Sequence, residues 1–267
     1  MLDAVHVPLS VEEALRALGG GASLIAGATT VMPVVNTSPV DFHELVSLRR
    51  AGLSGIEVGD GVATVGATTT IAELGADERL AFLRGVVAAF GSPPIRNLAT
   101  VGGNLFVPQP GGDLAVCLLA LDARVDVAGP DGRREAPVAG VLADGVRAGE
   151  IVTAVRFAIP ETGTWFYRKA MRRRLNSPAL VSVAAVVRSE DGVVRSARIA
   201  LGGAGARPVR ATRAEAALVG RPLDRVSVDE AGAAAAEDAV PFDDALASAW
   251  YRARVLPVHL RRALLGG

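Results

Sequence analysis

The feature that most constrains the fold of this chain is a pair of adjacent glycines, Gly102 and Gly103, between Thr100 and Asn104. Glycine has no Cβ and can adopt a positive φ, so two in a row let the backbone approach another group closely. Successive N–H groups in such a turn can form a nest that binds an anion, typically a phosphate. Arg96 is close enough in the sequence to add positive charge there. The run therefore indicates an anion site, with an ordinary turn as the alternative reading.

An earlier loop strengthens this interpretation. Residues 22–25 form a short apolar run, and they lead into AGATTV at residues 26–31. The small residues and two hydroxyl groups of this loop could supply further backbone and side-chain donors. Its alternative reading is a plain connection between a strand and a helix.

Three segments in this order resemble the FAD-binding subunit of the molybdenum hydroxylases. They read AGATTV at residues 26–31, IRNLATVGGN at residues 95–104 and GGDLAVCLLALDA at residues 111–123. The family is typified by carbon monoxide dehydrogenase medium subunits and the flavin segment of xanthine dehydrogenase. The resemblance continues through Tyr167-Arg168-Lys169 to the C-terminal Arg261-Arg262-Ala263-Leu264, so it covers nearly the whole chain.

Strands and helices alternate without regular βαβ spacing, which favours an α+β fold. Capping boxes are expected at Ser10 and Thr70, and apolar helices around residues 80–90 and 114–121. The resemblance implies an FAD-binding region at residues 1–160, made of two α+β subdomains at about 1–55 and 56–160. A C-terminal domain with a small antiparallel sheet and helices is then expected at residues 161–267.

The resemblance also implies which residues bind the cofactor FAD. They are Ile25, Ala26, Gly27, Ala28, Thr29, Thr30, Val31, Arg96, Ala99, Thr100, Gly102, Gly103, Asn104, Asp113 and Lys169. Within this set, the amides of Gly102 and Gly103 are expected to contact the pyrophosphate or the ribityl chain. Ala28 replaces a family glycine. If the loop needs a positive φ there, its geometry must shift or the affinity must fall, because alanine disfavours that conformation.

Two further residues have a structural alternative. Asp113 is expected to accept hydrogen bonds from ribityl hydroxyl groups, or to act as a helix N-cap before the apolar run that follows it. Lys169, the only lysine, matches a family lysine near the pyrimidine edge of the flavin, or it belongs to a solvated basic face with the neighbouring arginines.

The composition excludes several classes of function. With 28 basic and 28 acidic residues the formal net charge is zero, which argues against a nucleic-acid binder. The single cysteine, Cys117, excludes an internal disulfide and an iron–sulfur or zinc site built on this chain's thiolates. The three histidines have no metal-ligand spacing. Neither a membrane span nor a signal peptide is expected, so we expect the cytoplasm.

The sequence offers no catalytic residue of its own. The resemblance implies an electron-transfer subunit that works with a molybdopterin-binding large subunit and a 2Fe–2S small subunit, and delivers electrons to NAD or a quinone. One alternative is a stand-alone FAD-dependent oxidoreductase or diaphorase. Another is a flavin-free scaffold, suggested by Ala28 and by the lack of an aromatic residue at positions 176–179.

Overall fold

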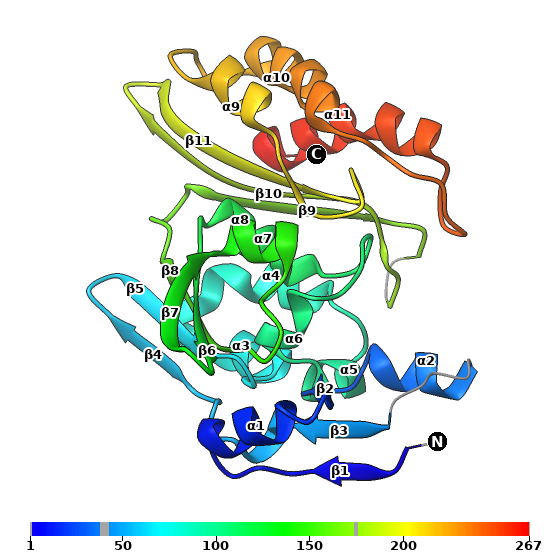
Figure 1. Cartoon of the computed structure of the whole chain (residues 1–267). Coiled ribbons are helices and arrows are strands. Elements are labelled where there is room, and N and C mark those ends of the chain that lie inside the picture. Colours follow the sequence, from blue (N-terminus) through cyan, green and yellow to red (C-terminus); the bar gives the residue numbers. More distant parts are fainter. Residues whose placement is uncertain (1, 38–42, 174–175, 267) are drawn as a thin grey trace. The chain divides into compact units, whose positions relative to one another are not determined.

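The computed structural model describes residues 2–37, 43–173 and 176–266, with its elements labelled in Figure 1. Its contacts divide the chain into two compact units, and each is described here by itself. The first unit is Met1–Leu83, Ser92–Val107 and Arg124–Phe157, and the second is Arg84–Gly91, Pro108–Ala123 and Ala158–Gly267. The second unit therefore includes two segments from before residue 160. The expected domain boundary at residues 160 and 161 stays a prediction.

A three-stranded parallel sheet begins the first unit, with β3 between β1 and β2. Its elements are β1 (Ala4–His6), α1 (Val11–Leu18), β2 (Ser23–Ile25), α2 (Val31–Thr37) and β3 (Glu44–Ser47). Ser10 caps α1 by accepting from the N–H of Glu13, as the sequence predicts. The Glu13 carboxylate, however, accepts from the amide of Leu9 rather than from that of Ser10.

A five-stranded sheet forms the rest of the first unit, in the order β4-β5-β8-β6-β7. The strands are β4 (Ile56–Gly59), β5 (Val62–Gly66), β6 (Arg124–Gly129), β7 (Gly132–Pro137) and β8 (Ile151–Ala158). The helices are η1 (Leu48–Arg50), α3 (Ile71–Ala76), η2 (Glu78–Leu83), α5 (Pro93–Leu98), α6 (Val101–Asn104) and α8 (Val138–Asp144). Thr70 begins α3 with the complete capping box that the sequence predicts.

The helix expected around residues 80–90 is interrupted. Its first part, η2, is a 3₁₀ helix in which Leu80 has the non-helical dihedral angles φ −111° and ψ 27°. Its second part is α4 (Arg84–Ala88), which belongs to the second unit. All three apolar residues Leu80, Leu83 and Val86 are buried, the first two in the first unit and Val86 in the second.

An antiparallel four-stranded sheet, in the order β12-β11-β10-β9, forms the centre of the second unit. The strands are β9 (Trp165–Met171), β10 (Ala179–Glu190), β11 (Val193–Gly202) and β12 (Val209–Arg210). The helices are α4, α7 (Asp113–Ala120), α9 (Thr212–Leu218), α10 (Arg225–Asp238) and α11 (Ala249–Leu265). In Figure 1, α9, α10 and α11 cover one face of this sheet and α7 the other. The first nine residues of β10 are consequently all buried.

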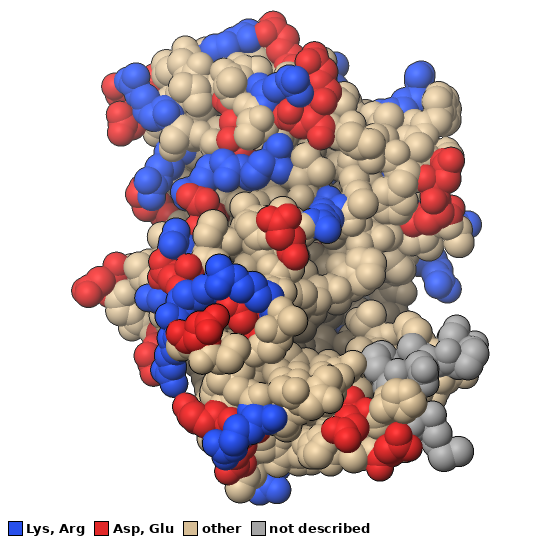
Figure 2. All heavy atoms as spheres, in the orientation of Figure 1, with Lys and Arg blue, Asp and Glu red and all other residues tan. Residues whose placement is uncertain are grey.

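These observations confirm the predicted α+β class and the antiparallel sheet of the C-terminal region. On the face drawn in Figure 2, Lys and Arg side chains are interspersed with Asp and Glu, so that face carries no continuous basic patch. No helix among the described residues is long and apolar enough to cross a membrane.

Candidate functional site

A cavity of about 650 Å³ lies in the first unit, where the loop after β2 meets the segments around α5 and η1. Parallel strands end at one edge of a sheet, and ligands commonly bind outside that edge. The lining residues are Ile25, Ala26, Gly27, Ala28, Thr29, Met32, Pro33, Ser47, Arg49, Ser54, Thr68, Thr70, Glu73, Ile95, Asn97, Leu98 and Thr100. Six of the predicted cofactor residues are therefore brought together here: Ile25, Ala26, Gly27, Ala28, Thr29 and Thr100.

The loop after β2 contains an alanine in a backbone conformation that alanine disfavours. Ala28 has φ 55°, in the left-handed region. A non-glycine residue there costs about 1–2 kcal/mol. Gly27, by contrast, has no positive φ but a very close neighbour, since a Cβ built on it would lie 1.9 Å from the carbonyl oxygen of Leu98. Ala28 therefore strains the loop, because it holds a conformation that glycine adopts without this cost.

The amides of this loop are not used inside the protein. The N–H groups of Gly27, Ala28 and Thr29 donate to no acceptor among the described residues, whereas Met32 donates to the carbonyl oxygen of Ala28 at 2.9 Å. These three residues also line the cavity. Unsatisfied backbone donors beside a cavity are well suited to the oxygens of an anion.

The Gly-Gly turn differs from the open nest that its sequence indicates. It forms the short helix α6, capped by Thr100, whose Oγ1 accepts from the N–H of Gly103 at 3.2 Å. The N–H of Gly102 donates to the carbonyl oxygen of Ala67 at 2.8 Å, and neither glycine has a positive φ. A Cβ on Gly102 would lie 2.8 Å from that of Ala67. The two amides therefore form no open nest in this structure, because both are used within the protein and Gly102 is needed for close packing; their contact with FAD stays a prediction.

The remaining predicted residues of the first unit surround the cavity without lining it. Asn104 is buried, with 4% of its surface exposed, and the carbonyl oxygen of Ala99 accepts a hydrogen bond from the amide of Ile71. The residues in this position are Thr30, Val31, Arg96, Ala99, Gly102, Gly103 and Asn104. Their contact with a cofactor stays a prediction.

In the second unit, the structure brings Asp113 and Lys169 together. The Nζ of Lys169 donates to Asp113 Oδ2 at 2.7 Å and to the carbonyl oxygen of Ala89 at 3.0 Å. The side chains are 2% exposed for Lys169 and 10% for Asp113. Both structural alternatives are wrong: Lys169 is not on a solvated face, and the N-cap of α7 is Gly112, with φ 72°, rather than Asp113.

This ion pair lies in a buried polar group with free hydrogen-bonding capacity. Asp113 Oδ1 and the hydroxyl of Tyr167 have no hydrogen-bond partner among the described residues. Burial raises the pKa of Asp113, and the charge of Lys169 offsets only part of this effect. Burial also raises the pKa of Tyr167 and of the free Cys117. Buried polar atoms without partners are uncommon and call for an explanation, for example a ligand.

Sequence reasoning missed the polar residues that line the cavity from η1 and its surroundings, above all Arg49. The signal was present in the strand pattern, because Ile25 and Ser47 are paired at the ends of the parallel strands β2 and β3. The segments that leave these two strands therefore start side by side. Among the described residues, no group of three His, Cys, Asp or Glu side chains could hold a metal ion.

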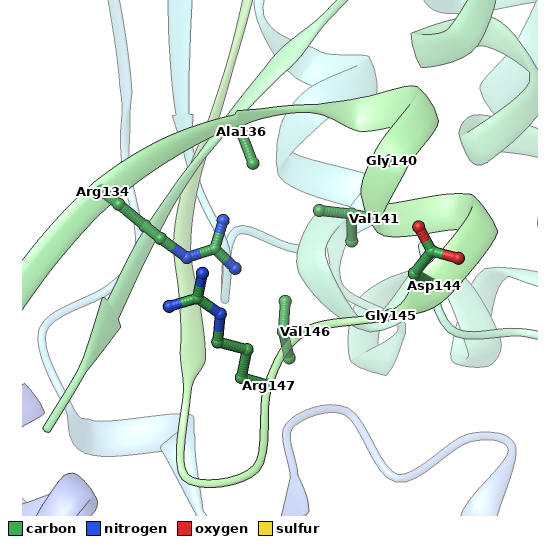
Figure 3. Close-up of a pocket in the computed structure, with 8 residues that line it drawn as sticks. All are labelled: Arg134, Ala136, Gly140, Val141, Asp144, Gly145, Val146 and Arg147. Carbon is green, nitrogen blue, oxygen red and sulfur yellow. The ribbon is translucent and has the colours of Figure 1, made fainter. Parts of the chain in front are cut away.

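A second cavity, of about 320 Å³, lies between β7, α8 and the loop after α8 (Figure 3). The guanidinium groups of Arg134 and Arg147 point toward one another there. Arg134 is paired through two hydrogen bonds, of 2.8 and 2.6 Å, with the buried carboxylate of Glu150. These bonds lower the pKa of Glu150 to about 2. Arg134 is thus already committed to an internal carboxylate.

Comparison with protein families gives two matches that together span the described chain. The family described as "FAD binding domain in molybdopterin dehydrogenase" matches residues 2–161. The family described as "CO dehydrogenase flavoprotein C-terminal domain" matches residues 165–266.

Individual relatives and solved structures match this chain over nearly the full length of both proteins. The carbon monoxide dehydrogenase medium chain of Afipia carboxidovorans is 31% identical, with 97% of this chain and 94% of that protein covered. The xanthine dehydrogenase FAD-binding subunit of Escherichia coli O157:H7 is 27% identical, with 96% and 90% covered. Carbon monoxide dehydrogenase from Hydrogenophaga pseudoflava superposes with a TM-score of 0.94 at 28% identity, with 99% of this chain and 96% of that chain covered. For quinoline 2-oxidoreductase from Pseudomonas putida 86 the TM-score is 0.91 at 28% identity, with the same coverage.

Proposed function

The chain belongs to the family of FAD-binding subunits of the molybdenum hydroxylases, and on this premise we propose that it is an electron-transfer subunit. In this proposal it passes electrons from an iron–sulfur partner through FAD to an external acceptor. Bound FAD supplies the redox chemistry, and the protein binds and orients it.

The observation that carries the proposal is the set of unused donors beside the larger cavity. Gly27, Ala28 and Thr29 present amides that have no acceptor among the described residues. The missing side chain of Gly27 lets this loop lie directly against Leu98. These donors suit the diphosphate of FAD, so the residues present fit the cofactor.

The buried pair of the second unit supports the proposal independently. Asp113 keeps one carboxylate oxygen without a partner, and Lys169 holds the other oxygen in place. A carboxylate oriented in this way can accept hydrogen bonds from the hydroxyl groups of a ribityl chain. Asp113 and Lys169 therefore remain our assigned contacts of FAD in the second unit.

The partners follow from the family. Relatives are named medium chain or medium subunit, as in the nicotine 6-hydroxylase medium subunit of Paenarthrobacter nicotinovorans. By analogy, we assign this chain a molybdopterin-binding large subunit and a 2Fe–2S small subunit as partners, NAD or a quinone as acceptor, and the cytoplasm as its location.

The visible absorption spectrum of the purified chain tests the proposal. The chain is mixed with FAD, desalted and compared with an equal amount of heat-unfolded chain treated in the same way. We expect oxidised-flavin bands to remain with the folded chain only. A colourless folded chain would contradict the proposal and favour a flavin-free scaffold.

A second assay separates a subunit from a complete enzyme. The FAD-loaded chain is mixed with NAD(P)H, an aldehyde or a purine, first alone and then after coexpression with the candidate large and small subunits. We expect oxidation of an aldehyde or purine only with the partners. Reduction of the flavin by an aldehyde or a purine with the chain alone would instead favour a stand-alone oxidoreductase.

A further inference from the structure

Arg49 lies at one edge of the parallel sheet. The loop after β2, which contains Gly27, Ala28 and Thr29, leaves the sheet at the same edge. It belongs to η1, which directly follows β3, and the last residue of β3 is paired with the last residue of β2. Arg49 lines the same cavity as Gly27, Ala28 and Thr29. It is the only Lys or Arg among the residues lining this cavity.

The guanidinium of Arg49 is not committed to any internal acid. It makes no ion pair or hydrogen bond among the described residues, in contrast to Arg134, which holds Glu150 beside the cavity of Figure 3. Glu73 is the acid that lines the larger cavity. Its Oε2 accepts from the amide and the hydroxyl of Thr70 at 2.7 and 2.8 Å, so this carboxylate serves the cap of α3.

A free guanidinium and free amides beside one cavity form a site for a doubly charged anion. Arginine binds phosphate oxygens through two parallel hydrogen bonds, and these charge-assisted bonds are stronger than neutral ones. Backbone amides add donors without adding charge. The combination fits a diphosphate better than an uncharged ligand.

We propose that Arg49 recognises the diphosphate of the bound flavin dinucleotide and so makes the site select FAD over riboflavin. This inference rests on the proposed function and adds to it the residue that determines cofactor specificity. Arg49 acts on binding alone and takes no part in electron transfer.

The test uses the full chain and three probes: FAD, riboflavin and inorganic pyrophosphate, each titrated by calorimetry. Arg49→Ala is compared with Arg49→Lys and with Arg50→Ala, a neighbouring exposed arginine that does not line the cavity. Both alanine variants lose one positive charge, so they share any general effect of net charge.

We expect Arg49→Ala to weaken the binding of FAD and of pyrophosphate by about tenfold to a hundredfold, the effect of losing a charge-assisted hydrogen bond. Riboflavin binding should not change, and Arg50→Ala should behave like the unmodified chain. Arg49→Lys should recover part of the loss. Added salt should weaken FAD binding more in the unmodified chain than in Arg49→Ala. The reason is that salt screens the attraction between the Arg49 guanidinium and the diphosphate, which the variant lacks.

Equal pyrophosphate binding by the unmodified chain and Arg49→Ala would overturn the inference, as would a failure of pyrophosphate to bind the unmodified chain. A chain that binds pyrophosphate through Arg49 but does not retain FAD would contradict the proposed function and leave the phosphate site standing. The two failures are therefore distinguishable.

Discussion

The loop at residues 27–30 and the turn formed by Thr100 and α6 have similar small-residue sequences but different states of hydrogen bonding. In the loop, the amides of Gly27 and Ala28 have no acceptor among the described residues. In the turn, the amides of Gly102 and Gly103 are both used, by Ala67 and by Thr100. Glycine serves close packing in both places. A glycine-rich motif therefore shows that the backbone is crowded, and only its hydrogen bonds show whether it is open to a ligand.

The buried pair of Asp113 and Lys169 in the second unit combines both states of hydrogen bonding. Lys169 donates to Asp113 and Ala89, like the amides of the turn, whereas one oxygen of Asp113 has no partner among the described residues, like the amides of the loop. Replacing residues in each region should separate internal structure from ligand binding.

The largest effect is expected from Lys169→Met, which leaves the buried carboxylate of Asp113 without its counter-ion. Breaking a buried ion pair costs about 3–5 kcal/mol. The pKa of Asp113, already raised by burial, should rise further. A carboxyl group with a raised folded-state pKa destabilises the fold once the pH exceeds its unfolded-state value, so the deficit should be largest at neutral pH and shrink on acidification. Denaturant unfolding at several pH values measures this.

The matched control for that experiment is Arg173→Met, which removes a charge from an exposed position nearby. It should change the free energy of unfolding little. The double variant Asp113→Asn/Lys169→Met should recover much of the loss. A pH-independent deficit in Lys169→Met would show that Asp113 is not charged beside Lys169.

The next effect concerns the open loop. Gly27→Ala puts a Cβ 1.9 Å from a backbone oxygen, so the loop or α5 must move. Overpacking of this kind lowers the free energy of unfolding by up to about 3 kcal/mol. FAD retention should fall together with the melting temperature. Gly59→Ala is the control, because a Cβ there meets nothing within 4 Å. Equal melting temperatures for the two variants would contradict the close approach to Leu98.

In the turn formed by Thr100 and α6, a substitution should lower the stability of the fold before it affects FAD binding. Gly102→Ala places a Cβ 2.8 Å from that of Ala67, and we expect a loss of about 2 kcal/mol. Ala67→Gly should relieve part of it in the double variant, and Gly140→Ala is the neutral control, because its Cβ would make only an ordinary contact, at 3.8 Å, with the side chain of Pro137. Thermal unfolding with and without FAD reports the result. A variant that loses FAD but keeps its stability would place Gly102 in the binding site instead.

A smaller loss is expected when the cap of the turn is removed. Thr100→Ala deletes the hydroxyl that accepts from Gly103, which costs about 1 kcal/mol for a typical N-cap. Thr100→Ser keeps the hydroxyl and should restore most of the stability. If Thr100→Ser is as unstable as Thr100→Ala in chemical denaturation, the cap is not the source of the effect.

The smallest effect, and the only stabilising one, is expected from Ala28→Gly. It removes the left-handed strain at φ 55° but adds conformational freedom to the unfolded chain, so the net gain should be about 0.5 kcal/mol. Ala26→Gly, at a residue without a positive φ, should destabilise by a similar amount. A loss of stability in Ala28→Gly would show that the loop does not hold that conformation in solution.

Local sequence signals predicted local structure well where the deciding contacts are near in the chain. The Thr70 capping box is complete because both partners lie within one helical turn. The alternative interpretation of Asp113 as a helix cap was wrong for the opposite reason: its side chain is held by Lys169, 56 positions away. Arg49 was missed because its relation to the loop depends on strand pairing rather than on sequence spacing.

By itself, the sequence determined the α+β class through its hydrophobic patterns, and the family and the cofactor through the resemblance of its motifs, in their order, to a known family. Only the tertiary structure decided which glycine loop is open and which is closed, since the acceptor of the Gly102 amide is Ala67, 35 positions away. It likewise decided that Asp113 and Lys169 form one buried pair and that Arg49 lines the cavity. These relations depend on contacts between segments distant in the chain, and a linear motif does not encode them.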